Sequence, residues 1–203
     1  MVTKLTLPRC RQCRLHLHFC LCDQIVPQNT ATRVVILTHW GEKRCVTNTG
    51  HLAQKCLINS EIRWRGNPDR SPAFLEDLLS DDSNAHVLFP APGAQILNPD
   101  FKLSHKKPIT LVALDGNWGQ ASHMLRREKV LQKLPKVILP SGPVSEYHLR
   151  RNQKTGNVCT FEAIARALGQ LESPQLQSVL ENVFNTFITR SLKMRGKVLE
   201  NER

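Results

Sequence analysis

The stretch Leu111-Val-Ala-Leu-Asp-Gly-Asn-Trp118 is an apolar run that ends in a carboxylate and turns through a glycine. A short apolar run bounded by turn residues predicts a buried strand. Apolar residues at helical spacing over 118–134 predict a helix directly after it. Asp115 is therefore expected at the carboxyl end of a central strand, where open α/β sheets bind ligands. Capping of the following helix or its turn is the alternative role for this carboxylate.

The rest of the chain repeats the alternation of strand and helix. Apolar runs predict further strands at residues 33–38, 61–65, 86–89 and 136–139. Helices are predicted at residues 49–57, 73–79 and 175–192, and another begins at Thr160, which is expected to cap it. This pattern predicts an α/β domain of about five strands with flanking helices. The sequence lacks GxGxxG and GxxxxGK[ST] motifs, which excludes the simplest NAD and ATP sites.

The chain is strongly basic and its basic residues are clustered. It carries 28 lysines and arginines against 17 acids in 203 residues, a formal net charge of +11. Clustering of this kind favours binding to a polyanion, although charge alone does not separate RNA from DNA or an anionic membrane. No apolar run approaches the roughly 18 residues of a spanning helix, and no signal-peptide pattern opens the chain. We therefore expect a cytoplasmic protein that does not enter a membrane.

The first chemical motif is a group of four cysteines, Cys10, Cys13, Cys20 and Cys22, within thirteen residues. A reducing compartment argues against disulfides, and this spacing suits a closed tetrahedral zinc site of structural type. His16 and His18 lie between the two pairs as alternative ligands. The four thiolates are preferred because they suffice by themselves, and metal binding would supply much of the folding free energy of so short a module. Unpaired reduced cysteines are the alternative.

Taken together, the motifs resemble the DTW-domain family of tRNA-uridine aminocarboxypropyltransferases. The matching features, in chain order, are the CxxC-x6-CxC cysteines, residues 39–42 with Asn48 and Thr49, residues 88–90, residues 115–121, Tyr147 with Leu149 and Arg150, and Thr160 with Glu162 and Ala163. The family motif is Asp-x-Thr-Trp, and Asn117 replaces its threonine here. Asparagine keeps a polar side chain that can cap a helix or form a turn, while any role specific to the hydroxyl is lost.

The resemblance implies a SPOUT-like knotted sheet flanked by helices over residues 31–203, preceded by a zinc module over residues 1–30. It implies transfer of the 3-amino-3-carboxypropyl group of S-adenosylmethionine to N3 of a tRNA uridine, with release of methylthioadenosine. For a bacterial-type member, the target is expected in the variable loop, and the enzyme is expected to be a monomer. The competing functions are methyl transfer or modification of ribosomal RNA with the same cofactor, and zinc-dependent RNA binding without catalysis.

The resemblance also suggests roles for individual residues. Asp115 is the expected general base, or else it holds the cofactor's ammonium or sulfonium group, and Trp118 either stacks on a base or packs in the core. The residues expected around the cofactor are Thr49, Leu88, Phe89, Pro90, Leu139, Ser141, Gly142, Tyr147, Leu149, Arg150, Thr160 and Glu162. The residues expected to contact RNA are Arg11, Arg14, Arg126, Arg127 and Arg151.

Overall fold

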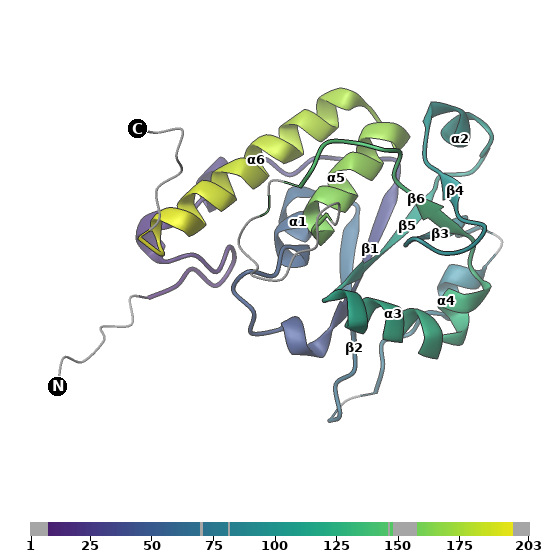
Figure 1. Ribbon diagram of the computed structural model, residues 1–203, viewed down its shortest axis with the longest axis horizontal. Helices are drawn as coiled ribbons and strands as arrows, with labels where there is room; N and C mark the ends of the chain where they lie inside the picture. The colour runs from purple at the N-terminus through teal and green to yellow at the C-terminus, as the bar shows by residue number, and fades with distance from the viewer. Residues whose placement is uncertain (1–7, 70, 81, 146, 148–157, 197–203) are drawn as a thin grey trace.

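The computed structural model (Figure 1) describes residues 8–69, 71–80, 82–145, 147 and 158–196, and is built on one sheet with six parallel strands. The strand order is β2-β1-β5-β3-β6-β4. The strands are β1 (Arg33–His39), β2 (Ser60–Arg65), β3 (Ala85–Leu88), β4 (Gln95–Ile96), β5 (Thr110–Asp115) and β6 (Lys136–Ile138). Every strand pairing is parallel, so all carboxyl ends meet at one edge of the sheet.

In the part of the chain that the structure describes, six α-helices flank this sheet. They are α1 (Gly50–Cys56), α2 (Pro99–Leu103), α3 (Trp118–Arg127), α4 (Lys129–Lys133), α5 (Thr160–Leu171) and α6 (Pro174–Lys193). Short 3-10 turns occur at η1 (Leu17–Phe19), η2 (Cys22–Gln24), η3 (Trp40–Glu42) and η4 (Glu76–Leu79). Figure 1 shows α1, α5 and α6 on one face of the sheet and α3 and α4 on the other.

The strands are buried on both faces, as expected for a parallel sheet between helix layers. Val34 and Ile36 of β1 belong to the core under α1, α5 and α6, whereas Val35 and Leu37 belong to the core under α3, α4 and η4. All six residues of β5 are buried, which confirms a central strand at 111–115. The predicted α/β class with flanking helices is confirmed.

The cysteine segment, residues 10–22, packs against α6. Leu15 and Leu21 are fully buried in the same core cluster as Phe184 of α6. Arg190 of α6 donates a hydrogen bond to the carbonyl of Cys20. The segment thus shares its core with the α1, α5 and α6 layer, and the division into units at residues 1–30 and 31–203 stays a prediction.

Several elements differ from the sequence-based expectation. The predicted helix over 118–134 is divided, because Glu128 adopts an extended conformation between α3 and α4. Its carboxylate lies 2.9 Å from Nε of Arg65, a side chain that is only 5% exposed. Pairing with this buried cation accounts for the break. The two-residue strand β4 and the helix α2 were not predicted, and the helix expected at 73–79 is reduced to η4.

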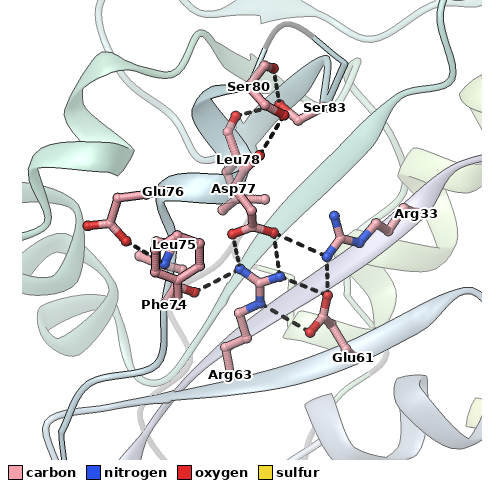
Figure 2. Close-up of polar contacts among 10 residues, drawn as sticks. All are labelled: Arg33, Glu61, Arg63, Phe74, Leu75, Glu76, Asp77, Leu78, Ser80 and Ser83. Atoms are coloured by element: carbon pink, nitrogen blue, oxygen red, sulfur yellow. Dashed lines mark hydrogen bonds and ion pairs between the residues drawn. The ribbon is translucent and has the colours of Figure 1, made fainter.

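A network of ion pairs fastens β2 to the segment before β3 (Figure 2). Arg63, 11% exposed, contacts Asp77 at 2.6 and 2.7 Å and Glu61 at 3.0 and 3.1 Å. Arg33 of β1 also pairs with Glu61. The pKa of Glu61 and that of Asp77 are lowered, chiefly by hydrogen bonds from Arg63. The network therefore stabilises the edge of the sheet as long as both acids are ionised.

Among the described residues, no helix has the length and apolar character needed to cross a bilayer. The cytoplasmic location stays a prediction. So does the knot of a SPOUT-like fold, because much of the connection between β6 and α5 lies outside the described residues.

Candidate active site

Asp115 lies at the carboxyl end of β5 and is the centre of a buried hydrogen-bonded cluster. It is 1% exposed. Asn48, just before α1, donates from Nδ2 to Asp115 Oδ2 at 2.6 Å, and the Thr160 hydroxyl donates to Oδ1 at 2.8 Å. The following helix is capped by Asn117, whose Oδ1 accepts from Gln120 N at 2.9 Å and whose own N–H donates to Gln120 Oε1 at 2.8 Å. The capping role considered for Asp115 therefore falls to Asn117.

The electrostatics of this cluster favour a carboxyl group that takes up a proton readily. Burial raises the pKa of Asp115 above its usual value, and the charge of buried Glu42 acts in the same direction. The hydrogen bonds from Asn48 and Thr160 oppose this rise without cancelling it. A carboxylate with a raised pKa, held at a strand end, has the properties of a general base.

Thr160 is not the helix cap that was predicted. Cys159 occupies the N-cap position of α5, and its backbone N–H donates to Glu162 Oε2 at 2.9 Å. This frees the Thr160 hydroxyl to bond to Asp115. Glu162 also accepts from Ser145 Oγ at 2.6 Å, so its buried carboxylate ties the segment after β6 to the start of α5.

Trp118, the first residue of α3, is 46% exposed and so is not a core side chain. Its ring lies against that of Phe89, just beyond β3, with centroids 5.5 Å apart at an interplanar angle of 51°. The two aromatic rings form a partly exposed apolar surface at the carboxyl edge of the sheet, next to Asp115.

The residues predicted to enclose the cofactor gather largely at this same edge. Strands β3 and β6 are adjacent, and Phe89 N bonds to Val137 O at 3.0 Å, so segments 88–90 and 139–142 leave the sheet side by side. Pro90, Ser141 and Gly142 are exposed, while Leu88 and Leu139 pack on the core. Thr49 is buried and accepts a 3.3 Å bond from Phe161 N.

The predicted residues of the polar segment after β6 divide into two groups. Tyr147 is buried, stacks on Phe184 with ring centroids 5.8 Å apart, and donates its hydroxyl to Thr47 O. These contacts anchor the segment to α6 and to the loop before α1. Leu149, Arg150 and Arg151 lie outside the described residues, so their predicted roles stay predictions.

A chain of polar contacts links Asp115 to the cysteine segment. Asn48 Oδ1 lies 3.4 Å from His51 Nδ1, and His51 Nε2 lies 3.4 Å from the carbonyl oxygen of Cys13. Burial and the charge of Arg14 lower the pKa of His51 to about 4, so this ring is neutral at physiological pH. Asn48 was predicted only as a residue that matches the family, and His51 was not predicted at all, because nothing in the local sequence marks their contacts.

The four cysteines of the predicted metal site meet in space. Their sulfur atoms all lie within 4.8 Å of one another. Cys10 and Cys22 are 3.6 Å apart and Cys13 and Cys20 are 3.7 Å apart, measured between the sulfurs. These thiols are free rather than joined as disulfides. Four sulfur ligands converging on one point are the donor set that Zn²⁺ prefers in structural sites.

The described residues predicted to contact RNA have different surroundings. Arg126 and Arg127 are exposed in the last turn of α3, and Arg11 is exposed in the cysteine segment. Arg14 is partly buried and donates to Cys45 O at 3.0 Å. Burial lowers its pKa, an effect opposed by the charge of Asp115 first and of Glu42 less strongly. Arg14 thus reaches from the cysteine segment toward the Asp115 cluster.

Known proteins are similar to this chain over most of its length. The family model described as "DTW domain" matches residues 7–192. "tRNA-uridine aminocarboxypropyltransferase 2" of Drosophila melanogaster is 28% identical over 188 residues, covering 88% of this chain and 72% of that protein. "tRNA-uridine aminocarboxypropyltransferase A" of Arabidopsis thaliana is 26% identical over 228 residues, covering 94% of this chain and 86% of that protein. The chain spans only 57% of the Macaca fascicularis relative, at 26% identity over 171 residues.

Among solved structures, "Structure of the SAM-dependent rRNA:acp-transferase Tsr3 from Vulcanisaeta distributa" matches with a TM-score of 0.49 and 15% sequence identity. The match covers 82% of this chain and 85% of that one. A likeness this distant supports no conclusion about the present chain.

Proposed function

The chain belongs to the DTW-domain family, and from that premise we propose that it is a tRNA-uridine aminocarboxypropyltransferase. It transfers the 3-amino-3-carboxypropyl group of S-adenosylmethionine to N3 of a tRNA uridine, in the variable loop. The names of the relatives support the reaction and the substrate. The observation that carries the proposal is the buried Asp115 carboxylate, held by Asn48 and Thr160 at the ligand-binding edge of the sheet.

Asp115 is the proposed acceptor of the proton that uridine N3 must lose. Its raised pKa suits that task, because a base works best when its pKa is near the working pH. Each carboxylate oxygen here accepts one described bond and has capacity for another. Electrostatic support of the donor's positive groups is the alternative role for the same carboxylate.

Thr160 is the proposed route between Asp115 and the substrate. Asp115 is almost fully buried, whereas Thr160 is partly exposed and its hydroxyl already donates to the carboxylate. A hydroxyl can accept one proton while it donates another. Thr160 can therefore take the N3 proton and pass its own to Asp115, with no need for the carboxylate to reach the surface.

The residues at the carboxyl edge of the sheet fit S-adenosylmethionine. Phe89 and Trp118 offer apolar rings for an adenine, and the exposed residues Ser141 and Gly142 offer backbone groups. The carboxylates of Asp115 and Glu42 suit a donor with sulfonium and ammonium charges. When bound, S-adenosylmethionine supplies a carbon activated by its sulfonium. The protein's part is to align that carbon with N3, which can be worth about 7 to 11 kcal/mol of barrier.

The cysteine cluster is proposed to hold one structural Zn²⁺, which orders the segment around Leu15 and Leu21 against α6. Exposed arginines at the end of α3 and in the cysteine segment are proposed to bind tRNA phosphates. Such contacts give affinity without sequence information, so recognition of the target requires an unstacked loop base.

The product left behind by the donor tests this proposal. Purified protein is incubated with S-adenosylmethionine and unmodified tRNA, and the small-molecule products are identified by mass spectrometry. Aminocarboxypropyl transfer predicts methylthioadenosine, whereas methyl transfer would leave S-adenosylhomocysteine. A parallel reaction with ribosomal RNA tests the other substrate. Formation of neither product, despite tRNA binding, would favour an RNA-binding protein without catalysis.

A further inference from the structure

A cavity of about 310 Å³ lies between the cysteine segment, α1 and the end of β2. Its walls include Arg11, Arg14, His51, Lys55, Ile62 and Trp64. Its volume is at the lower end of the range of small-ligand sites. The proposed reaction does not involve Lys55, Ile62 or Trp64.

The charged residues that line the cavity favour an anionic ligand. Three of its lining residues, Arg11, Arg14 and Lys55, are cations, and none is acidic. S-adenosylmethionine carries a sulfonium and an ammonium against one carboxylate, so three cations disfavour it here. A phosphate group, by contrast, accepts several charge-assisted hydrogen bonds from arginine and lysine.

The cavity also has an aromatic wall. Trp64 of β2 is partly buried and meets Trp40 edge to face, with ring centroids 5.7 Å apart at 82°. Lys43 Nζ lies 4.0 Å from the centroid of the Trp40 ring. Aromatic rings beside cations are the combination with which proteins bind unstacked nucleotides, because the rings stack on bases while the cations neutralise phosphates.

The cavity is adjacent to the Asp115 cluster. His51 lines it and contacts Asn48, which donates to Asp115. Arg14 also lines it, and the charges of Asp115 and Arg14 act on each other. A nucleotide in the cavity would therefore be separated from the Asp115 carboxylate by only two side chains.

We propose that this cavity binds a nucleotide of the RNA substrate that neighbours the modified uridine. Its base lies against Trp64, and its phosphate lies among Arg14, Arg11 and Lys55. This inference rests on the proposed function and adds to it a subsite in which the cysteine segment and α1 jointly hold the strand, so that the next base is directed toward Thr160 and the Asp115 cluster.

The test compares Trp64→Ala, Trp64→Phe and Lys55→Ala with wild type, and uses Lys106→Ala, at an exposed lysine before β5, as control. Binding of unmodified tRNA is measured by fluorescence anisotropy without the donor. We expect Trp64→Ala to weaken tRNA binding about tenfold and Trp64→Phe to retain most of the wild-type affinity. Lys55→Ala should reduce the magnitude of the slope of log K against log salt by about 0.7. The Lys106→Ala variant should bind tRNA as wild type does.

Calorimetry of S-adenosylmethionine binding completes the test. The Kd for S-adenosylmethionine should be unchanged in all four variants. Weaker binding of S-adenosylmethionine in Trp64→Ala or Lys55→Ala would make the cavity a cofactor site and overturn the inference. Wild-type tRNA affinity in Trp64→Ala and Lys55→Ala would overturn it as well. Because these readouts need no turnover, absence of transfer by the wild type would contradict the proposed function separately.

Discussion

The side-chain amide of Asn48 donates a 2.6 Å hydrogen bond to the carboxylate of Asp115, which is 67 residues further along the chain. Thr160, another 45 residues on, donates to the other oxygen of the same carboxylate. Three elements thus meet at one buried charge: the start of α1, the end of β5 and the start of α5. Hydrogen bonds to the ionised form offset part of the cost of burying it.

Gly50 provides the space for this cluster. A Cβ at this position would lie 2.5 Å from Asp115 Oδ2 and 2.7 Å from its Cγ. Gly50→Ala should therefore displace the carboxylate, abolish transfer and cost about 1 to 3 kcal/mol in the free energy of unfolding. Urea denaturation measures that cost. In an Asp115→Ala background the same substitution should cost much less, and an equal cost in both backgrounds would show that the clash is not with Asp115.

The number of zinc ions per chain tests metal binding by the four cysteines. Elemental analysis should find about one zinc per wild-type chain and almost none after Cys10→Ser with Cys13→Ser, because two thiolates cannot close a tetrahedral site. Cys45→Ser is the matched control, since Cys45 is a free thiol outside the cluster and should keep the metal. Full zinc content in the double variant would contradict the four-thiolate assignment.

The exposed pair Arg126 and Arg127 is expected to contact tRNA phosphates. Replacing both by alanine should weaken tRNA binding and reduce the slope of log K against log salt by about 1.4 to 1.8, the value for two lost phosphate contacts. The control is replacement of Lys106 and Lys107 by alanine, because these lysines precede β5 and lie outside α3; the slope should then stay as in wild type. An unchanged slope in the arginine variant would exclude these contacts.

Because of the ion pairs of Arg63, the free energy of unfolding should decrease as the pH falls into the acid range. The pKa values of Glu61 and Asp77 are lowered in the folded state, so their contribution is present above about pH 4 and is lost as pH falls through the folded pKa values. Arg63→Met should cost about 1 to 2 kcal/mol at pH 7, a modest figure because both acids are partly exposed.

At pH 3 the difference in the free energy of unfolding between Arg63→Met and wild type should be smaller than at pH 7. Urea unfolding at the two pH values measures this difference. Arg44→Met, at an exposed arginine, should leave stability unchanged at both. An equal difference in the free energy of unfolding at pH 3 and pH 7 would show that Glu61 and Asp77 do not cause the loss of stability in Arg63→Met.

Local pattern was enough to predict the central strand, the position of Asp115 at its end and the grouping of the four cysteines. It failed where a distant residue decides the outcome. Glu128 breaks the predicted helix because Arg65, 63 positions earlier, binds its carboxylate. Thr160 looked like a cap, but Cys159 holds that position and the Thr160 hydroxyl bonds to Asp115. Such pairings depend on the assembled sheet, which no single stretch of sequence encodes.

The most direct test of the central claim is mass spectrometry of nucleosides from unmodified tRNA incubated with S-adenosylmethionine and either wild-type protein or Asp115→Asn. We predict that wild type forms aminocarboxypropyl-uridine and that Asp115→Asn, although folded, forms almost none. Modification at the wild-type rate by Asp115→Asn would contradict the role of the carboxylate. Absence of the modified nucleoside with wild-type protein would contradict the proposed reaction itself.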